Sequence, residues 1–339
     1  MGMFNTVAMA AAGLLSFALS ALLGKWLIPQ LHKLHFGQTI REEGPAWHEK
    51  KQGTPTMGGV LFILSTTVCF LGALGALKLA KTGHVFLNPY CTVRMLAGMG
   101  LALGCGLIGF ADDFIKVVKK RNLGLTAMQK LLLQLFVAGA YAVLLYFYGG
   151  GDFRIPFVGE VHWGIWYIPF CMFVIVAMTN ATNLSDGVDG LCGMSSFVAA
   201  LFLLLLAGLS GLYGESMMAS AMAGGLAGFL VWNIHPAKVF MGDTGSLFIG
   251  GALAGLAFGI EQPFMLVPVG ILFIAENLSV ILQVGYFKLT HGKRLFKMSP
   301  LHHHFELCGW SENKIVAVFS AVTFAGGLIA VLIMLWAPC

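Results

Sequence analysis

Residues 95–113, MLAGMGLALGCGLIGFADD, decide the fold of this chain of 339 residues. Residues 95–111 carry no charge, and the stretch then ends in two adjacent aspartates. About 17 to 25 apolar residues are enough for a helix to cross the hydrocarbon core of a bilayer. Similar runs recur along the whole sequence. We therefore expect a polytopic membrane protein built of α-helices, with acidic side chains where some helices end.

The composition supports the same class of protein. Hydrophobic residues make up 58% of the chain and charged residues only 10%, and the mean hydropathy is +0.84. Soluble domains carry about 25% charged residues, so the sequence excludes a soluble enzyme, a disordered chain and a nucleic-acid binder. An outer-membrane barrel is excluded as well, because its strands are about ten residues of alternating character. The seven cysteines contain no CxxC pair and predict packing residues, not a disulfide framework.

Five polar segments interrupt the apolar sequence. They span residues 30–56, 112–128, 180–190, 233–243 and 288–314. Each apolar stretch between two segments is broken near its middle by a polar or Gly/Pro patch, at 81–88, 149–162, 210–216 and 261–263. A stretch with a central break predicts a helical hairpin that returns the chain to the side it left. The sequence therefore predicts one all-α domain over residues 1–339, with ten transmembrane helices.

The basic residues predict the orientation in the membrane. Sixteen of the 20 Lys and Arg lie in or beside the five polar segments. Lys and Arg accumulate in the cytoplasmic loops of membrane proteins. We therefore expect all five segments to be cytoplasmic and both termini to be extracytoplasmic.

Glycines at helical spacing predict close packing between helices. Gly251, Gly255 and Gly259 are spaced four residues apart, and small residues at this spacing let transmembrane helices approach closely. The stretch 104–109 matches the G-x-G-x-x-G pattern of dinucleotide-binding sites. That pattern requires a preceding strand, whereas this one lies inside an apolar span, so it also predicts packing.

Asp112 and Asp113 form the first candidate site. On a continuing helix, Asp113, Lys116 and Lys120 share one face, and Asp112 neighbours Lys116. A charged helix end that extends toward the membrane surface would show the same pattern. Adjacent acids beside several bases also suit a metal-assisted phosphate site, in which carboxylates hold a hard cation and lysines neutralise phosphate oxygens.

Two further polar segments contain acids near helix ends. The first, NLSDGVDG at 183–190, offers Asn183, Asp186 and Asp189, which suit either a plain turn or the recognition of a base or ribose. The second, residues 233–246, contains Pro236, which ends a helix, and Asp243, which suits either a helix cap or a metal ligand.

The run His302, His303 and His304 invites a zinc interpretation. Consecutive helical residues are rotated by about 100°, so the three rings cannot all face one ion. The sequence also lacks the spaced ligand pairs of zinc sites. Hydrogen bonding or acid–base work beside a phosphate is the better functional interpretation. Glu276, inside the ninth expected span, predicts an interhelical contact or groove lining.

Five motifs resemble those of one enzyme family. They are KKQGTPTMGG at 50–59, the Asp pair at 112–113, NLSDGVDG at 183–190, the stretch 233–246 and PLHHHFE at 300–306. Together they resemble the polyprenyl-phosphate N-acetylhexosamine-1-phosphate transferase superfamily. The last motif is similar to the element that separates its phospho-N-acetylmuramoyl-pentapeptide transferase branch from the branches that use GlcNAc and other hexosamines.

The resemblance implies a reaction and its partners. Undecaprenyl phosphate would attack the sugar-bearing phosphate of UDP-MurNAc-pentapeptide, giving lipid I and UMP for peptidoglycan synthesis, with Mg²⁺ as cofactor. The site would lie on the cytoplasmic face of the bacterial inner membrane, in a homodimer. Both substrates are anionic, which suits the basic segments. A route through an aspartyl-phosphate intermediate is chemically open as well.

The resemblance also implies roles for individual residues. Asp112 would be the general base, Asp113 a supporting acid and Asp243 the Mg²⁺ ligand, while His302 and His303 would contact the sugar phosphate or support catalysis. Lys116 and Lys120 would face phosphates. The residues implied to bind uridine are Lys51, Asn183, Asp186, Asp189 and Phe240, the last by stacking on uracil, with Asn233 as a nearby polar contact.

Two other functions compete with this one. A sibling enzyme that loads GlcNAc-1-phosphate would share most of the motifs, although the histidine motif argues against it. A secondary transporter would place its ionisable groups near the bilayer midplane and usually shows internal repeats. Here the acids gather at one interface, and the halves of the chain show no repeat.

Overall fold

The computed structural model describes residues 2–33, 53–80, 89–119, 123–148 and 151–336. Ten helices of at least 18 residues make up most of this part of the chain. They are α1 (Gly2–Lys33), α2 (Gly59–Leu79), α3 (Pro89–Val118), α4 (Ala127–Phe147), α5 (Tyr167–Leu184), α6 (Leu191–Leu209), α7 (Tyr213–Asn233), α8 (Gly242–Gly259), α10 (Ile271–Leu289) and α12 (Glu312–Trp336). The prediction of a helical membrane protein is confirmed.

Eight of these helices are long and apolar enough to cross a membrane, while α7 and α8 do not meet that criterion. The difference has a packing reason. Helix α8 is rich in glycine and alanine, and every residue from Thr244 to Gly259 is buried. Because other helices surround α8 on all sides, close packing requires small residues there, and these residues are less hydrophobic than those of a helix that faces lipid. A count of ten membrane spans remains a prediction.

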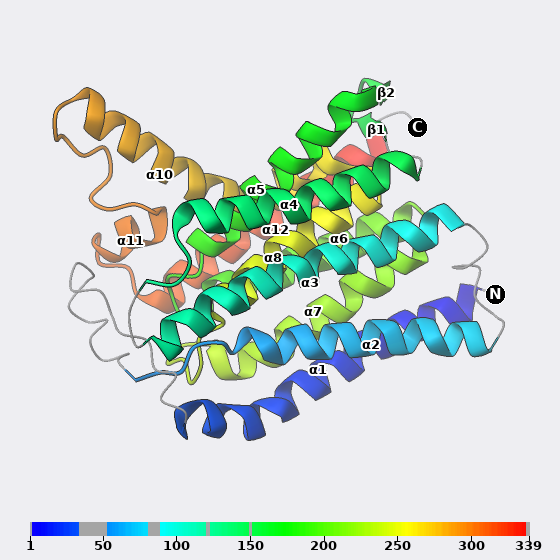
Figure 1. The fold of residues 1–339 in the computed structure, drawn as a ribbon, viewed down its shortest axis with the longest axis horizontal. Coiled ribbons are helices and arrows are strands. Elements are labelled where there is room, and N and C mark those ends of the chain that lie inside the picture. The colour runs from blue at the N-terminus through cyan, green and yellow to red at the C-terminus, as the bar shows by residue number, and fades with distance from the viewer. Residues whose placement is uncertain (1, 34–52, 81–88, 120–122, 149–150, 337–339) are drawn as a thin grey trace.

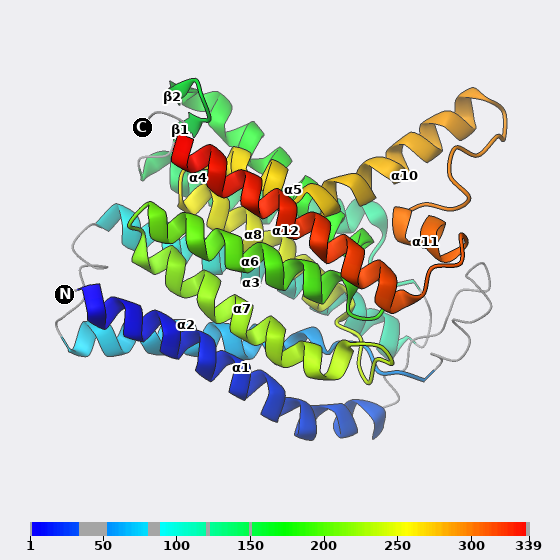
Figure 2. The same ribbon diagram turned by 180° about the vertical axis from the view of Figure 1, so that it is seen from behind.

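The central helix α8 packs against α2, α3, α5 and α6, and α7 packs against α1, α2 and α6. Figures 1 and 2 show these helices side by side, with the N- and C-terminal ends of the chain at one end of the bundle and the α7–α8 connection at the other. In both views α10 leans away from the bundle and leads to the short helix α11 (Leu301–Glu306).

Short elements fill the turns at the end where the termini lie. The break predicted at 149–162 contains an antiparallel hairpin of β1 (Asp152–Ile155) and β2 (Gly159–His162), in which Asp152 pairs with His162. An all-α fold is therefore not quite correct. The alternating residues DFRI place Phe153 inward, where its ring packs on Trp163, Phe170 and Phe264. The turns η3 (Gly164–Trp166), η4 (Pro263–Met265) and α9 (Leu266–Val269) complete the described elements.

Glycine contacts set the distance between α3 and α8. A Cβ atom on Gly109 would overlap the backbone carbonyl of Asp243, and one on Gly255 would press on Gly98. The glycines of the 104–109 stretch also face protein, since Gly106 lies against Phe248. The packing interpretation of these glycines is confirmed. The contact at Gly109 matters for function, because it lies one turn from Asp112 and Asp113.

Candidate active site

Three aspartates from two helices meet at one end of the bundle. Asp112 and Asp113 lie in the last turns of α3, and Asp243 lies in the first turn of α8. One carboxylate oxygen from each lies within 4.8 Å of the others. Asp112 and Asp113 are nearly fully buried, whereas the side chain of Asp243 is 19% exposed. Asp243 is therefore the member of the cluster that is most open to a ligand.

Two lysines neutralise this cluster. The Lys116 ammonium lies 2.5 Å from Asp112 Oδ2, 3.7 Å from Asp113 Oδ1 and 3.0 Å from Asp243 Oδ2. The Lys130 ammonium lies 2.9 Å from the same oxygen of Asp243. Three negative and two positive side chains thus share one small volume, which is an arrangement able to bind both phosphate and a cation.

Lys130 was not among the predicted site residues. It lies in the first turns of α4, which begins with a capping box formed by Thr126 and Gln129. A cation near the N-terminus of a helix is unfavourable for the helix dipole, and Lys130 is followed by a long apolar run. That unfavourable placement was the available signal that Lys130 serves the site.

The buried aspartates are fixed by backbone groups. Asp112 Oδ1 accepts a hydrogen bond from Leu125 N at 2.7 Å. Asp113 Oδ2 accepts from Thr244 N at 2.9 Å and from Thr244 Oγ1 at 2.7 Å. Asp113 therefore binds the first turn of α8 to α3, and it sets the position of the neighbouring Asp243.

Asn183 adds a third element to the cluster. Its Nδ2 donates to Asp243 Oδ1 at 2.8 Å and to Ser246 Oγ at 2.9 Å. Its Oδ1 accepts from the Lys130 ammonium at 3.3 Å. Both polar atoms of Asn183 thus orient site residues, and α5 is joined to α4 and α8 at the site.

Asp186 lies half-buried in the turn between α5 and α6. Burial raises the pKa of its carboxyl to about 8, and the negative charges of Asp243, Asp113 and Asp189 act in the same direction. At neutral pH this group is therefore largely protonated and can donate a hydrogen bond.

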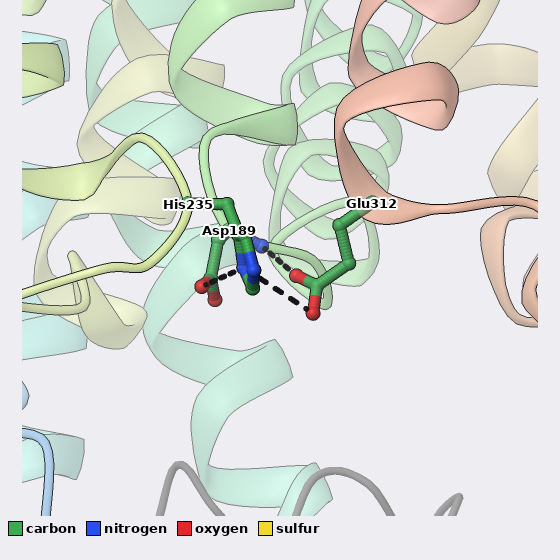
Figure 3. Close-up of side chains that lie close together, drawn as sticks. All are labelled: Asp189, His235 and Glu312. Carbon is green, nitrogen blue, oxygen red and sulfur yellow. Dashed lines mark hydrogen bonds and ion pairs between the residues drawn. The ribbon is translucent and has the colours of Figure 1, made fainter.

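Asp189 belongs to a separate cluster. Asp189 Oδ2 lies 3.0 Å from His235 Nδ1 and accepts from Ala237 N at 3.0 Å. His235 Nδ1 lies 3.5 Å from Glu312 Oε1, and Glu312 Oε2 accepts from Asp189 N at 3.2 Å. Figure 3 shows the three side chains directed toward one another. They connect the loops that precede α6 and α8 to the first residue of α12.

Asn233 is the last residue of α7, and Phe240 lies in the α7–α8 connection. Asn233 is buried, accepts from Gly190 N at 3.1 Å and donates to Val239 O at 2.9 Å. Its amide therefore stabilises the two loops, and this gives it a positioning role. Phe240 is half-buried, and its backbone bonds to Pro55 and Gly58 bring the segment before α2 to the site.

The three histidines have three different environments. His302 is buried against Glu276, with Nδ1 3.2 Å from Oε2. His303 Nδ1 lies 2.7 Å from Glu306 Oε2, and His304 Nδ1 accepts from Lys297 N at 3.1 Å. The prediction that they do not share one ion agrees with this geometry. Lys51 and Lys120 lie outside the described residues.

Two family models match parts of this chain. A family model described as glycosyl transferase family 4 matches residues 95–261, the part of the chain that holds the aspartates, Lys130 and Asn183. A second model, for phospho-N-acetylmuramoyl-pentapeptide-transferase signature 1, matches residues 51–63. The chain thus combines a helical membrane fold with a segment similar to glycosyl transferase family 4.

Curated relatives identify the family. The chain is 46% identical over 310 residues to a phospho-N-acetylmuramoyl-pentapeptide-transferase of Clostridium perfringens, covering 91% of this chain and 93% of the relative. It is 45% identical over 325 residues to the enzyme of that name from Bacillus subtilis, covering 94% of each. The chain belongs to the phospho-N-acetylmuramoyl-pentapeptide-transferase family.

Proposed function

We propose that this protein transfers phospho-MurNAc-pentapeptide from UDP-MurNAc-pentapeptide to undecaprenyl phosphate and so forms lipid I and UMP. Family membership supports this reaction. One observation supports the location of the active site, because three aspartates and two lysines converge where membrane helices end. A lipid phosphate lies at that depth, at the boundary between apolar helices and polar loops. The site can therefore receive one substrate from the bilayer and the other from the aqueous side.

Phosphoryl transfer needs positioning and charge neutralisation more than covalent chemistry by the protein. An oxygen of the lipid phosphate attacks the sugar-bearing phosphorus of the nucleotide, and the bond to the other phosphate breaks to release UMP. Asp112 accepts any proton left on the attacking phosphate. Lys116 and Lys130 neutralise the phosphate oxygens, while Asn183 and Asp113 hold Asp243 in place.

The donor set fits Mg²⁺. The Lys116 ammonium already contacts all three carboxylates, so their oxygens converge on a point that a cation can occupy. Oxygen ligands are those that Mg²⁺ prefers. Asp243, the most exposed of the three, would hold the ion, which would supply additional charge neutralisation at the phosphates.

The uridine part of the donor binds at the loops around Asp186 and Asp189. Asp186 donates or accepts a hydrogen bond to the base or ribose, Phe240 stacks on uracil, and Lys51 contributes its charge. Asn233 positions the same loops. His303, which is more exposed than His302, lies on the helix that would contact the sugar phosphate.

The setting of the reaction follows from the same proposal. The chain has ten spans, with both termini extracytoplasmic and the site on the cytoplasmic face of the bacterial inner membrane. The bundle supports this topology, since both chain ends lie opposite the site (Figure 1). A homodimer is proposed on the resemblance alone.

The test is UMP release from UDP-MurNAc-pentapeptide in the presence of undecaprenyl phosphate, with and without Mg²⁺. We expect turnover only with both substrates and the metal. UDP-GlcNAc serves as the competing donor, and turnover with it alone would establish the sibling activity instead. Uptake of a solute into vesicles without UMP release would support the transporter.

A further inference from the structure

A carboxylate inside an apolar helix contacts the first histidine of the 302–304 run. Glu276 lies in α10 and is fully buried. Its Oε1 accepts a hydrogen bond from His302 N at 3.2 Å, and its Oε2 lies 3.2 Å from His302 Nδ1. A carboxylate among apolar helices costs free energy unless it is paired. Glu276 is therefore a residue whose position needs a functional reason.

The opposite edge of the His302 ring touches the turn between α5 and α6. A Cβ atom on Gly187 would overlap His302 Nε2, so the ring and the backbone of this turn are in direct contact. His302 itself is only 1% exposed. Among the described residues, neither ring nitrogen has a hydrogen-bond partner. The imidazole therefore acts as a spacer between Glu276 and Gly187.

Gly187 adjoins Asp186 in the sequence, and the place of this turn decides where the Asp186 carboxyl lies. The hydrogen bond from His302 N to Glu276 Oε1 fixes the start of α11. Glu276 Oε2 lies 3.2 Å from Nδ1 without forming a hydrogen bond, so it places a carboxylate beside the ring. One hydrogen bond and one close contact from the same side chain thus determine where the ring lies.

We propose that Glu276 is a positioning residue for binding of the uridine nucleotide: through His302 it holds the turn of Asp186 and Gly187 in place. The inference rests on the proposed role of Asp186 at the nucleotide. It assigns to an intramembrane carboxylate an effect on the water-soluble substrate and none on the lipid substrate.

The first test measures KM for each substrate separately in the Glu276→Gln variant. Glutamine keeps an acceptor for His302 N–H and removes the charge. We expect KM for UDP-MurNAc-pentapeptide to rise about tenfold, as for partners that orient a ligand-binding residue, while kcat and KM for undecaprenyl phosphate stay within about threefold of wild type. The matched control is Glu215→Gln. Glu215 is a buried glutamate in α7 beside Gly259, at the opposite end of α8. We expect KM for the nucleotide and kcat to stay unchanged in this variant.

The second test removes the contact from its other side. Gly187→Ala forces the turn and the ring apart, and we expect it to raise the same KM. The double variant Gly187→Ala/His302→Ala lacks the ring that the new methyl group would overlap. It should therefore bind the nucleotide no more weakly than His302→Ala alone, so the two substitutions should not be additive. This pair tests the link from His302 to the nucleotide-binding turn, on which the role of Glu276 depends, even if Glu276→Gln does not fold.

Two outcomes overturn the proposal. One is a loss of kcat in Glu276→Gln with KM for the nucleotide unchanged, and the other is strict additivity of the two substitutions at 187 and 302. Both require that the wild-type protein releases UMP. Absence of UMP from the wild type would instead refute the proposed function, so the two failures are distinguishable.

Discussion

The Lys130 ammonium lies 2.9 Å from Asp243 Oδ2, although 113 residues separate the two in the chain. The same oxygen also contacts Lys116 at 3.0 Å. One carboxylate oxygen therefore holds two ammonium groups together at the end of the bundle. Two cations at such a distance repel each other unless an anion lies between or beside them, and Asp243 is that anion.

Lys130→Gln should lower kcat about 100-fold. It removes a preorganised positive charge from the phosphate site, and the loss of one such stabilising group has an effect of this order. The measurement is UMP release at saturating substrates. Lys78→Gln, an exposed lysine at the last turn of α2, is the control and should retain wild-type turnover. A rate for Lys130→Gln within a few-fold of wild type would show that Lys130 has no part in the reaction.

Thr244→Val should lower both the stability of the protein and its turnover. The variant removes the hydroxyl that donates to Asp113 Oδ2 at 2.7 Å, and a hydrogen bond to a charged group contributes about 1.5–3 kcal/mol. Unfolding in detergent micelles should therefore occur at a lower temperature, and turnover should fall because Asp243 is held less firmly.

The control for that variant is Thr323→Val. Thr323 is also buried, but its hydroxyl bonds only to Phe319 O in its own helix. Its loss should leave turnover unchanged. Equal activity in the two variants would mean that the bond between Asp113 and Thr244 does not position the site.

Gly109→Ala should disrupt the site from within α3. A methyl group at this position would overlap the carbonyl of Asp243, so the two helices must separate and the aspartates move apart. Gly100→Ala, in the same helix, adds a methyl group that meets no atom of another described element within 4 Å. That control should be neutral or more stable by about 0.5–1 kcal/mol, because alanine favours helix. Turnover and melting temperature are measured for both; a Gly109→Ala protein that matches the control would disprove the close approach.

Asp186 should make the stability depend on pH. Its pKa is about 8 in the folded protein and about 3.9 in an unfolded chain. The folded state binds the proton more tightly, so the stabilisation is complete below pH 4 and is lost as the pH rises through 8. Asp186→Asn, which resembles the protonated acid, should melt at least several degrees above wild type at pH 8.5, because each kcal/mol of lost stabilisation lowers the melting temperature by about 2–4 °C. At pH 4 the difference should vanish.

The relevant measurement is the difference in melting temperature between Asp186→Asn and wild type at several pH values, since other groups titrate equally in both proteins. A difference that stays constant from pH 5 to pH 9 would show that Asp186 is ionised throughout.

The sequence alone predicted much of this protein. Apolar run lengths predicted a helical membrane protein, because a span must pair its backbone groups internally in lipid. Glycine spacing predicted close packing between helices, since small residues permit it, although it did not say which helices meet. The acids at helix ends and the order of the motifs predicted the family. These features are local, and each depends on residues that are close together in the chain.

The remainder was decided by tertiary structure. The hairpin β1–β2 escaped prediction because its strands have four residues each, too few for a periodic pattern. The sequence predicted an interhelical contact or groove lining for Glu276 without a named partner, and it did not single out Lys130. Only the packing of α4 and α10 gave these residues Asp243 and His302 as partners. Local sequence determines which residues span the bilayer and where charges end a helix. Which of those charges meet depends on long-range contacts. One example is the close contact between Gly109 and the backbone of Asp243, which leaves no room for a side chain at 109. No short stretch of sequence contains that information.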